Sequence, residues 1–373
     1  MINTDKSAKE LLDRRVAQVN STGCYENAIY CGYGEYADVL RRRGHVIHRV
    51  DTPRGLSPLS LLVSTWKTFR LLRKHRYDII HTHGSVIWFV GAMAALLARV
   101  PCVVHQVHGF HHHANMNSVR RWLYILWQRG LSLLVKKLLF QNKADVDECL
   151  RSRIAPARKL VLVGNGIQLD ESNAQPQPCN DPPVILCVSR FEPVKNHGMV
   201  LDAARLLRDR GECFVLNLAG DGELIPECEA WVREHALTEK VRFLGYRDDV
   251  PSLTLEADVC VLVSIKEGLP RAIIEAAACG RPMVATDVVG NRNAIVDGVT
   301  GFLVPLNDAK ALADQLQTLL HNPGLRKDVG ERARAYARTH FDERKVTERI
   351  MEVYDQLAEQ LPFARRRHTE ANM

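Results

Sequence analysis

Short hydrophobic runs alternate with amphipathic stretches along the chain. In the first half, the hydrophobic runs predict strands over residues 25–31, 45–50, 78–81, 102–107, 137–141 and 159–164. In the second half, they predict strands over residues 184–189, 215–219, 241–244, 259–263, 283–286 and 301–304. Amphipathic stretches predict helices over residues 35–43, 60–75, 308–321, 325–338 and 342–360. Apolar strands that alternate with helices favour parallel sheets covered on both faces, so we predict an α/β chain with two doubly wound domains.

The segment 164–183 is rich in Pro, Asn, Asp and Gln, and this composition predicts a linker. We therefore predict an N-terminal domain over 1–165, a C-terminal domain over 180–340, and a helix with a basic tail over 341–373. Only Met1–Thr4 precede the first helical stretch. The first strand of the N-terminal domain is therefore either vestigial or missing because the true start lies upstream.

The composition is typical of a globular protein, with 46% hydrophobic and 25% charged residues. The longest apolar run, residues 86–98, is too short to span a bilayer. The polar amino terminus shows no signal peptide, and ten cysteines occur without a Cys-x-x-Cys pair. We therefore expect free thiols in a reducing compartment and a cytoplasmic protein.

The net charge of +7 is distributed unevenly. Residues 1–165 carry 25 Lys and Arg against 11 Asp and Glu, whereas the remainder carries 25 against 32. The basic clusters of the first half lie near Trp66, Phe69, Trp122 and Trp127. Basic residues beside aromatic ones predict contact with an anionic membrane surface. Ordinary solvated helix faces are the alternative, and nucleic acid is disfavoured because no nucleic-acid motif is present.

The first chemical motif covers residues 266–275, directly after the apolar run 257–264. A loop in this place lies at the carboxyl end of a parallel strand, where open α/β sheets bind ligands. Pro270 is predicted as the first helical residue, so the amides of Gly268, Leu269 and Arg271 would face a diphosphate at a helix amino terminus. Glu275 could accept hydrogen bonds from ribose hydroxyls, and Glu267 from sugar hydroxyls. A solvated helix start with acidic residues is the alternative interpretation.

The second motif covers residues 189–196 and follows the first strand of the second domain. Arg190 and Lys195 in this loop could clamp a diphosphate and stabilise its developing charge. Taken alone, the loop is equally typical of a basic protein surface. Its coincidence with the first motif favours the binding interpretation.

With these motifs the sequence resembles the retaining glycosyltransferases of family 4, which have the GT-B fold, over nearly the whole chain. The resemblance includes the pair Glu267 and Glu275 and the loop with Arg190 and Lys195. It also includes the segments 77–83, 107–110, 218–222, 241–246 and 297–305.

The resemblance implies two Rossmann-like domains with a cleft between them and a last helix that crosses back to the first domain. It implies that Arg190, Lys195 and the residues Gly268, Leu269, Pro270 and Arg271 bind the donor diphosphate. Glu275 would bind the ribose, and Tyr246 with the backbone of 245–247 would hold the base. His108 and Glu267 would be the catalytic contacts to the transferred sugar, with His108 facing it across the cleft.

The resemblance further implies transfer of a hexose or N-acetylhexosamine from a nucleotide sugar, with a UDP-sugar favoured, and retention of configuration. The acceptor would be a glycan or a polyprenyl-diphosphate-linked saccharide in surface polysaccharide synthesis. No metal and no other cofactor would be required. A nucleotide-sugar 2-epimerase of related fold and a non-catalytic donor-binding protein are the alternatives.

Three further features bear on this interpretation. The histidine-rich run 105–113 suggests a metal site, but no carboxylates accompany it nearby, so we disfavour a metal. The pair Asp145 and Asp147 matches the Asp-x-Asp pattern of metal-dependent transferases, and we interpret it as a surface helix start. His81 is predicted to pack at a strand end, and His83 to face the cleft. Asn293 stands where the resembling enzymes usually have Glu, which would weaken an anchor near the donor.

Overall fold

The computed structural model describes residues 1–361, apart from 3, 33, 51–56, 111–115 and 168–177. The chain divides into two compact units. The first contains Met1–Gly164 together with the chain from Arg344 onward, and the second contains Asn165–Glu343. Every strand that the hydrophobic runs predict is present, with ends within a few residues of the predicted ones.

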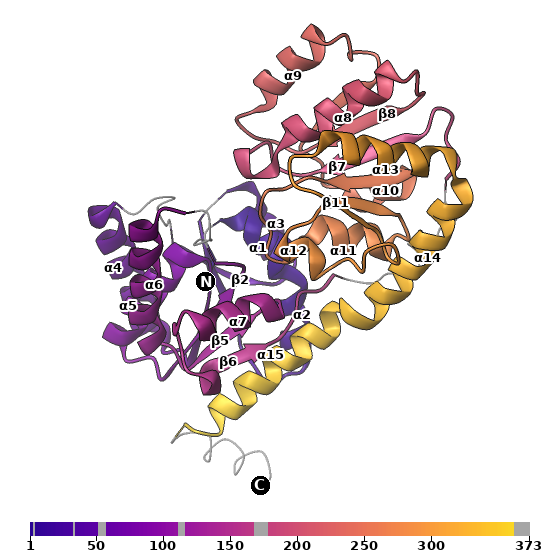
Figure 1. Cartoon of the computed structure of the whole chain (residues 1–373). Helices are drawn as coiled ribbons and strands as arrows, with labels where there is room; N and C mark the ends of the chain where they lie inside the picture. The colour runs from indigo at the N-terminus through magenta and orange to yellow at the C-terminus, as the bar shows by residue number, and fades with distance from the viewer. Residues whose placement is uncertain (3, 33, 51–56, 111–115, 168–177, 362–373) are drawn as a thin grey trace. The chain divides into compact units, whose positions relative to one another are not determined.

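The first unit contains two parallel sheets flanked by helices (Figure 1). Its strands are β1 (Ala28–Cys31), β2 (Val46–Arg49), β3 (Ile79–His83), β4 (Cys102–Val107), β5 (Lys137–Phe140) and β6 (Leu160–Leu162). Its helices are α1 (Asp5–Leu11), α2 (Asp13–Ser21), α3 (Glu35–Arg42), α4 (Pro58–His75), α5 (Ser85–Ala98), α6 (Ser118–Leu133), α7 (Lys143–Arg151), the 3-10 turn η1 (Ala157–Lys159) and α15 (Glu343–Ala358). β1 pairs with β2, and the other four strands follow the order β3-β4-β5-β6.

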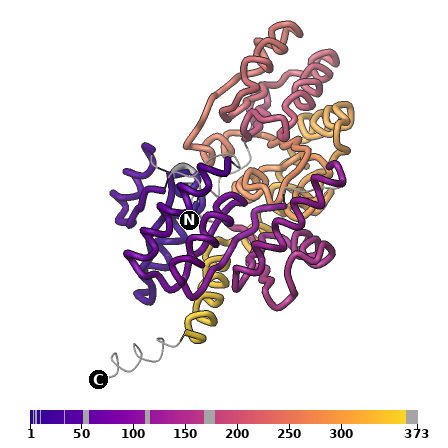
Figure 2. Tube along the Cα trace, turned by 90° about the vertical axis from the view of Figure 1, so that its left-hand side faces the viewer, coloured from indigo at the N-terminus to yellow at the C-terminus, as the bar shows by residue number. Residues whose placement is uncertain are grey.

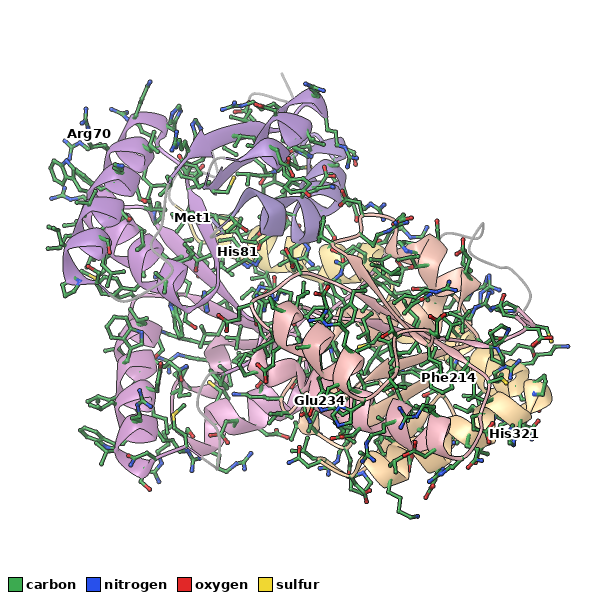
Figure 3. The ribbon with its side chains drawn as sticks, turned by 90° about the horizontal axis from the view of Figure 1, so that it is seen from above. Met1, Arg70, His81, Phe214, Glu234 and His321 are labelled. Atoms are coloured by element: carbon green, nitrogen blue, oxygen red, sulfur yellow. The ribbon has the colours of Figure 1, made fainter. Side chains whose placement is uncertain are left out.

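The position expected for a first strand is occupied by Met1 and Ile2. The Ile2 amide donates to Tyr30 O of β1 at 2.9 Å, and the His83 amide of β3 donates to Met1 O at 3.0 Å. Figure 3 shows Met1 next to His81. These two residues therefore bridge the two sheets.

Helix α15 packs against one face of the larger sheet of the first unit. Its residues Val346, Ile350 and Val353 recur at the spacing of one helical face, and they are buried against Val104 of β4 and Leu139 of β5. Figure 1 and Figure 2 show this yellow helix beside the purple chain of the first unit. The end of the chain thus completes the core of the unit in which the chain begins.

The second unit contains one six-stranded parallel sheet. Its strands are β7 (Val184–Val188), β8 (Val215–Ala219), β9 (Val241–Gly245), β10 (Val259–Leu262), β11 (Met283–Thr286) and β12 (Phe302–Val304). Its helices are η3 (Pro193–Lys195), α8 (His197–Asp209), α9 (Ile225–Glu234), α10 (Val250–Glu256), α11 (Arg271–Ala278), α12 (Val289–Arg292), α13 (Ala309–His321) and α14 (Pro323–His340). The strand order is β12-β11-β10-β7-β8-β9, so the winding direction reverses between β7 and β10.

Alternate residues of these strands face two separate cores. Ile185 and Cys187 face the core that contains α8 and α13, whereas Leu186 faces the core that contains α11 and α14. This pattern is the double coverage expected for short apolar strands in a parallel sheet. The predicted α/β class with doubly wound sheets is confirmed.

Within the described residues, no helix is both long enough and apolar enough to cross a membrane.

A buried ion pair holds α14 to the sheet of the second unit. Arg326 Nη2 lies 3.1 Å from Asp258 Oδ1, and both side chains are almost completely buried. The other carboxylate oxygen of Asp258 accepts from the Val184 amide at 2.9 Å and from Asn180 Nδ2 at 2.7 Å. Asp258 therefore connects the start of β7 with α14.

Replacing Arg326 by methionine should destabilise the second unit by about 3 kcal/mol or more, because the Asp258 carboxylate would stay buried without its cation. Urea unfolding followed by circular dichroism measures this loss. Lys310→Met is the matched control, since Lys310 pairs with Asp314 on the surface and is 77% exposed. Loss of the Lys310–Asp314 pair should change the free energy of unfolding by about 0.5 kcal/mol or less. Equal effects of the two substitutions would contradict the role given to Arg326.

Candidate functional site

The candidate site of the second unit lies where the winding of its sheet reverses. The loops after β7 and β10 leave neighbouring strands at the same edge of the sheet, where ligands of open α/β sheets bind. The Ile265 amide, after β10, donates to Val194 O, after β7, at 2.8 Å. This backbone hydrogen bond fixes the two predicted motifs side by side.

Two predicted site residues meet at this point. Lys195 Nζ donates to Glu267 Oε1 at 2.5 Å, and their side chains are only 17% and 12% exposed. The pair places one cation and one carboxylate together in a largely buried position. Such a pair can bind an anion through Lys195 and hydroxyl groups through Glu267.

Two close backbone approaches shape the loops. A Cβ atom added at Gly290 of α12 would lie 2.4 Å from the carbonyl group of Glu267, so only glycine allows α12 to pack against this residue. Gly220, after β8, has a φ of +152°, and a Cβ there would lie 1.9 Å from Ser189 O. The glycines therefore hold the backbone around Glu267 and Arg190 in place.

His197, the first residue of α8, also supports the loop after β7. Its ring stacks on Phe191 with centroids 4.0 Å apart, and its Nε2 lies 3.0 Å from Ser189 Oγ. Burial, and to a smaller extent the neighbouring Lys195, lowers the pKa of His197 to about 4. The ring is therefore neutral near pH 7, and it adds no charge beneath the loop.

Helix α11 begins one residue later than predicted. Pro270 is its N-cap in extended conformation, and Arg271 is the first helical residue. The donors of the first turn are the amides of residues 271–273, which have no partner within a helix. Leu269, before the helix, is buried, and its carbonyl accepts from Asn165 Nδ2 at 3.3 Å. The amino terminus of α11 still presents backbone donors at the carboxyl end of β10.

Glu275 lies one turn into α11 and contacts Arg271. Arg271 Nη2 donates to Glu275 Oε1 at 3.0 Å, and Arg271 Nε donates to the same oxygen at 3.3 Å. The other predicted cation, Arg190, is 63% exposed, and its Nη1 donates to Glu192 Oε1 at 2.5 Å. The three predicted cations of the site thus contact carboxylates of their own unit.

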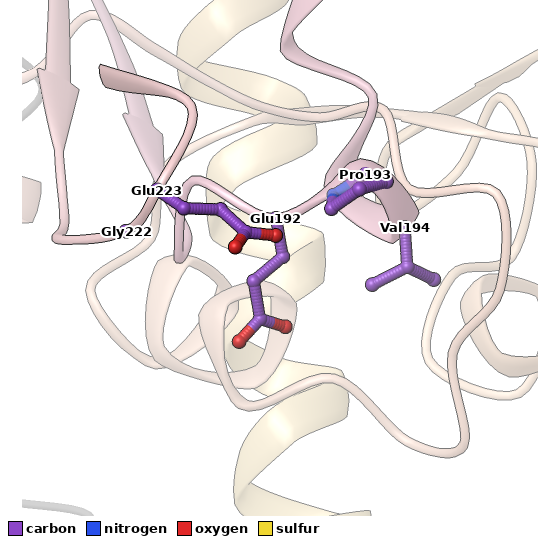
Figure 4. Close-up of a pocket in the computed structure, with 5 residues that line it drawn as sticks. All are labelled: Glu192, Pro193, Val194, Gly222 and Glu223. Carbon is purple, nitrogen blue, oxygen red and sulfur yellow. The ribbon is translucent and has the colours of Figure 1, made fainter. Parts of the chain in front are cut away.

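An open pocket lies beside the loop after β7. It is lined by Glu192, Pro193, Val194, Gly222 and Glu223. Figure 4 shows the side chains of Glu192 and Glu223 within it. Two carboxylates repel an anion, so this pocket does not suit a diphosphate. The backbone donors of α11 and the Lys195 side chain suit it better.

Tyr246 follows β9, two strands from β7. It is 38% exposed, and its hydroxyl group donates to Asp248 Oδ1 at 3.0 Å. The Gly245 carbonyl beside it accepts from the Gly220 amide at 2.8 Å. Tyr246 therefore lies along the same edge of the sheet, further out than Lys195 and Glu267.

His108 belongs to the first unit and follows β4. Gln141 Nε2 lies 3.0 Å from His108 Nδ1, and His108 Nε2 lies 3.1 Å from His83 Nδ1. If the Gln141 amide donates, His108 carries its proton on Nε2. Burial, with a smaller contribution from Arg15, lowers the pKa of His108 to about 4. His108 is therefore neutral at pH 7.

Histidine contacts extend from His108 to α15. The rings of His81 and His83 stack with centroids 4.3 Å apart, and His81 Nδ1 lies 2.6 Å from the Tyr354 hydroxyl oxygen. His83 is buried, and burial holds the pKa of both rings well below the usual range. His81 therefore packs inside the first unit, but in the middle of β3 and not at a strand end as predicted, because the strand extends two residues further than the hydrophobic run indicated.

The features weighed for metal binding have structural roles where the structure describes them. Among the described residues, no group of three or more His, Cys, Asp or Glu side chains could hold a metal ion. His111–His113 lie outside the described residues. Asp145 lies in the first turn of α7, where its amide donates to Asn142 Oδ1 at 2.8 Å, so the interpretation of this segment as a helix start is confirmed.

Asn293 follows α12, close to Gly290 and so near the loop with Glu267. Its Nδ2 atom is buried and makes no hydrogen bond with the part of the chain that the structure describes. Asn291, by contrast, donates to Thr286 O at 2.8 Å and braces the start of α12.

Sequence reasoning missed the residues that support the site. His197, Gly290 and Asn291 brace the second unit, and Gln141 orients His108 in the first. His197 follows the second motif directly, and its position there is a usable signal. Gln141 gave none, because its contact with His108 joins the ends of two strands that are far apart in the sequence.

The comparisons with known proteins cover both units. Residues 10–166 match the model of the glycosyl transferase 4-like domain, and residues 168–336 match that of the glycosyl transferases group 1. The chain is 30% identical over 276 residues to UDP-Gal:α-D-GlcNAc-diphosphoundecaprenol α-1,3-galactosyltransferase from Escherichia coli, covering 70% of this chain and 71% of that protein.

A second relative comes from Campylobacter jejuni. The chain is 25% identical over 341 residues to its N,N'-diacetylbacillosaminyl-diphospho-undecaprenol α-1,3-N-acetylgalactosaminyltransferase, covering 87% of this chain and 89% of that protein.

The fold resembles a solved structure as well. HepE from Anabaena, solved in complex with UDP and glucose, superposes with a TM-score of 0.77 at 20% identity, covering 92% of this chain and 95% of that one. At this identity the likeness shows the fold alone. Together with the family models and the Escherichia coli relative, it leads to one conclusion: the chain belongs to the glycosyl transferases group 1, glycosyltransferases with the GT-B fold.

Proposed function

We propose that this glycosyltransferase moves a hexose or N-acetylhexosamine from a UDP-sugar to a polyprenyl-diphosphate-linked saccharide in surface polysaccharide synthesis. The observation that carries the proposal is the meeting of Lys195 and Glu267 beside the amino terminus of α11. A diphosphate needs cations and backbone donors, and a sugar needs an acceptor for its hydroxyl groups. This site offers all three.

The names of the relatives support the choice of substrates. The Escherichia coli relative is named for UDP-galactose and a diphosphoundecaprenol acceptor, and the Campylobacter jejuni relative for a diphospho-undecaprenol acceptor. HepE was solved with UDP. We extend the nucleotide and the acceptor class, but not the identity of the sugar, to this chain.

Donor binding would exchange partners at the site. In the structure, Lys195 contacts Glu267, Arg190 contacts Glu192, and Arg271 contacts Glu275. We propose that the diphosphate takes Lys195 and Arg190, which leaves the Glu267 carboxylate to accept from sugar hydroxyls. Glu275, released from Arg271, would accept from the ribose, and the backbone beside Tyr246 would hold the base.

We propose transfer with retention by attack on the same face as the leaving group. The acceptor oxygen bonds to the anomeric carbon while the bond from that carbon to the diphosphate breaks. The proton of the acceptor hydroxyl passes to a diphosphate oxygen. Arg190, Lys195 and the amides of α11 stabilise the departing charge, so the proposal includes no metal ion.

We propose that neutral His108 contacts the transferred sugar. With Nδ1 held by the Gln141 amide, His108 carries its proton on Nε2, which lies 3.1 Å from His83 Nδ1. We propose that this N–H exchanges His83 for a sugar hydroxyl or ring oxygen when the donor binds. The basic first unit and the lipid of the acceptor lead us to propose further that the chain works at the anionic inner surface of the membrane.

Replacing Lys195 or Glu275 by alanine should weaken UDP binding about ten- to a hundredfold, because each substitution removes a charged hydrogen-bonding partner of the donor. Thermal shift with UDP-, GDP-, ADP- and TDP-sugars measures the loss, since a ligand of the folded state raises Tm. Glu267→Gln should leave UDP binding nearly unchanged and weaken only the UDP-sugar.

The surface variant Lys310→Ala serves as the control and should respond like the wild-type chain. A UDP-dependent shift that survives both Lys195→Ala and Glu275→Ala would refute the donor site. If the chain epimerises the UDP-sugar but does not transfer it to an undecaprenyl-diphosphate saccharide, the epimerase alternative is favoured. If the chain binds the donor but forms neither product, the non-catalytic alternative is favoured.

Replacing His108 by alanine should lower kcat about a hundredfold and leave UDP binding intact, because the substitution removes one donor to the transition state. Since the pKa of His108 lies near 4, its ring stays neutral from pH 6 to pH 8, and the loss should be constant over this range. Protonation should reduce activity only as the pH falls toward 4. Steady-state kinetics at several pH values test both points, with exposed His75→Ala as the control. A loss that vanishes at pH 6 would contradict the neutral role of His108.

A further inference from the structure

Helix α4 carries an apolar stripe on its outer face. Leu59, Leu62, Val63 and Trp66 recur at the spacing i, i+3, i+4 and i+7, so they share one side of the helix. They are 73%, 67%, 45% and 58% exposed. The opposite side, which faces the interior, contains Leu61 and Leu72 together with the polar Ser64, Thr65 and Thr68. A helix on a protein surface usually exposes polar residues, so the exposed stripe of α4 is unusual.

Helix α6 repeats the same arrangement. Val119, Trp122, Leu123 and Leu126 follow the same spacing and are 47–65% exposed, and Leu133 continues the stripe at 79%. The buried side of α6 contains Leu131 between the polar Gln128 and Ser132. Two helices of one unit thus expose stripes of large apolar residues.

The two stripes belong to one flank of the first unit. Helix α5 packs against α4 and also contacts α6, and Phe89 of α5 stacks on Trp127 of α6 with ring centroids 5.0 Å apart. Figure 1 shows the three helices together, and Figure 3 shows Arg70 projecting outward from the unit. We call the exposed sides of α4 and α6 the apolar flank.

The charges around the apolar flank identify what covers it. The sequences of α4, α5 and α6 contain no Asp or Glu. The α4 stripe continues toward the carboxyl end of the helix as exposed Arg70, Arg73 and Lys74, and exposed Arg120 begins α6. A second copy of the same flank would bring like charges together. An anionic lipid surface offers hydrocarbon for the stripes and negative headgroups for the cations.

We infer that α4 and α6 insert their apolar stripes into the interfacial layer of an anionic bilayer, lying in its plane. Helices of this kind enter about 5–10 Å, as far as the boundary between headgroups and acyl chains. The inference deepens the proposed function: that function needs only attraction of the basic unit to the membrane, whereas insertion adds burial of Trp66, Trp122 and their leucine neighbours. Membrane binding would then persist when salt screens the charges.

Sedimentation of the full chain with vesicles tests this inference. Vesicles of phosphatidylcholine with phosphatidylglycerol should bind the wild-type chain, and 1 M NaCl, which shortens the Debye length to about 3 Å, should weaken the binding without abolishing it. The variant Leu62→Ser/Trp66→Ser/Trp122→Ser/Leu126→Ser should lose at least about tenfold in partitioning at either salt concentration. Arg70→Gln/Arg73→Gln/Lys74→Gln should lose binding mainly at low salt.

Tryptophan fluorescence gives an independent readout. Lipids brominated on their acyl chains should quench Trp66 and Trp122 in the bound wild-type chain, and Trp66→Phe/Trp122→Phe should remove most of this quenching. Trp88 is buried in the first unit, and Trp231 belongs to the second, so both should be little affected. Leu150→Ser, an exposed leucine of α7, is the matched control and should bind as the wild-type chain does.

Full release of the wild-type chain by salt, or absence of quenching, would overturn insertion. A concentration-dependent dimer that the serine variant abolishes, without vesicle binding, would assign the flank to a second copy instead. Thermal shifts of the same variants with UDP-sugars distinguish failure of the insertion proposal from failure of the proposed function. A serine variant that keeps its shift but loses vesicle binding supports insertion. A wild-type chain that inserts without any nucleotide shift would leave insertion standing and refute the proposed function.

Discussion

The reversal of winding between β7 and β10 is the constraint on which the candidate site depends. A parallel sheet directs all carboxyl ends to one edge, but only at a reversal do the loops of two adjacent strands turn toward opposite faces and leave room for a ligand. Lys195 and Glu267, 72 positions apart in the sequence, meet there because β7 pairs with β10 and because Ile265 binds Val194. Gly290 then lets α12 close against Glu267. The ion pair is a consequence of the topology, and the topology rests on the two cores that α8, α13, α11 and α14 form with the sheet.

The pairing of the site's charges has an energetic consequence. Lys195 and Glu267 are both largely buried, so either side chain alone would lose solvation without compensation. As a pair they keep the site electrically balanced until an anion arrives. Under the proposed function, a diphosphate would replace one carboxylate partner of each cation, which would lower the net gain from each contact but select for a ligand of at least two negative charges. Arg190 is mostly exposed, so its exchange of Glu192 for phosphate should be energetically close to neutral and serve mainly to guide the ligand.

The sequence predicted the strands and helices of the fold, but few of the contacts between side chains. Apolar runs located every strand, because buried parallel strands such as residues 259–262 leave no polar position to confuse the pattern. Each loop was predicted to follow its own strand, yet the Lys195–Glu267 pair could not be predicted, because strand order is a tertiary property. The helix start at Pro270 was misplaced by one residue, since proline fits both the N-cap and the first turn. The bracing by His197 and the orientation of His108 by Gln141 depend on side-chain packing, which periodicity does not report.

The apolar flank is recognised when the spacing of apolar residues along each helix is compared with their burial. Helix α5 is apolar on all sides, and most of it is buried, so its composition reflects folding alone. Helix α6 is less hydrophobic on average, yet its Val119, Trp122 and Leu126 lie opposite the buried Gln128 and Ser132. Folding gains nothing from exposing these apolar residues, because only burial removes their surface from water. The arrangement is repeated on α4, and acidic residues are absent from both helices. A lipid surface would remove these exposed apolar side chains from water without any change in the sheets that position His108.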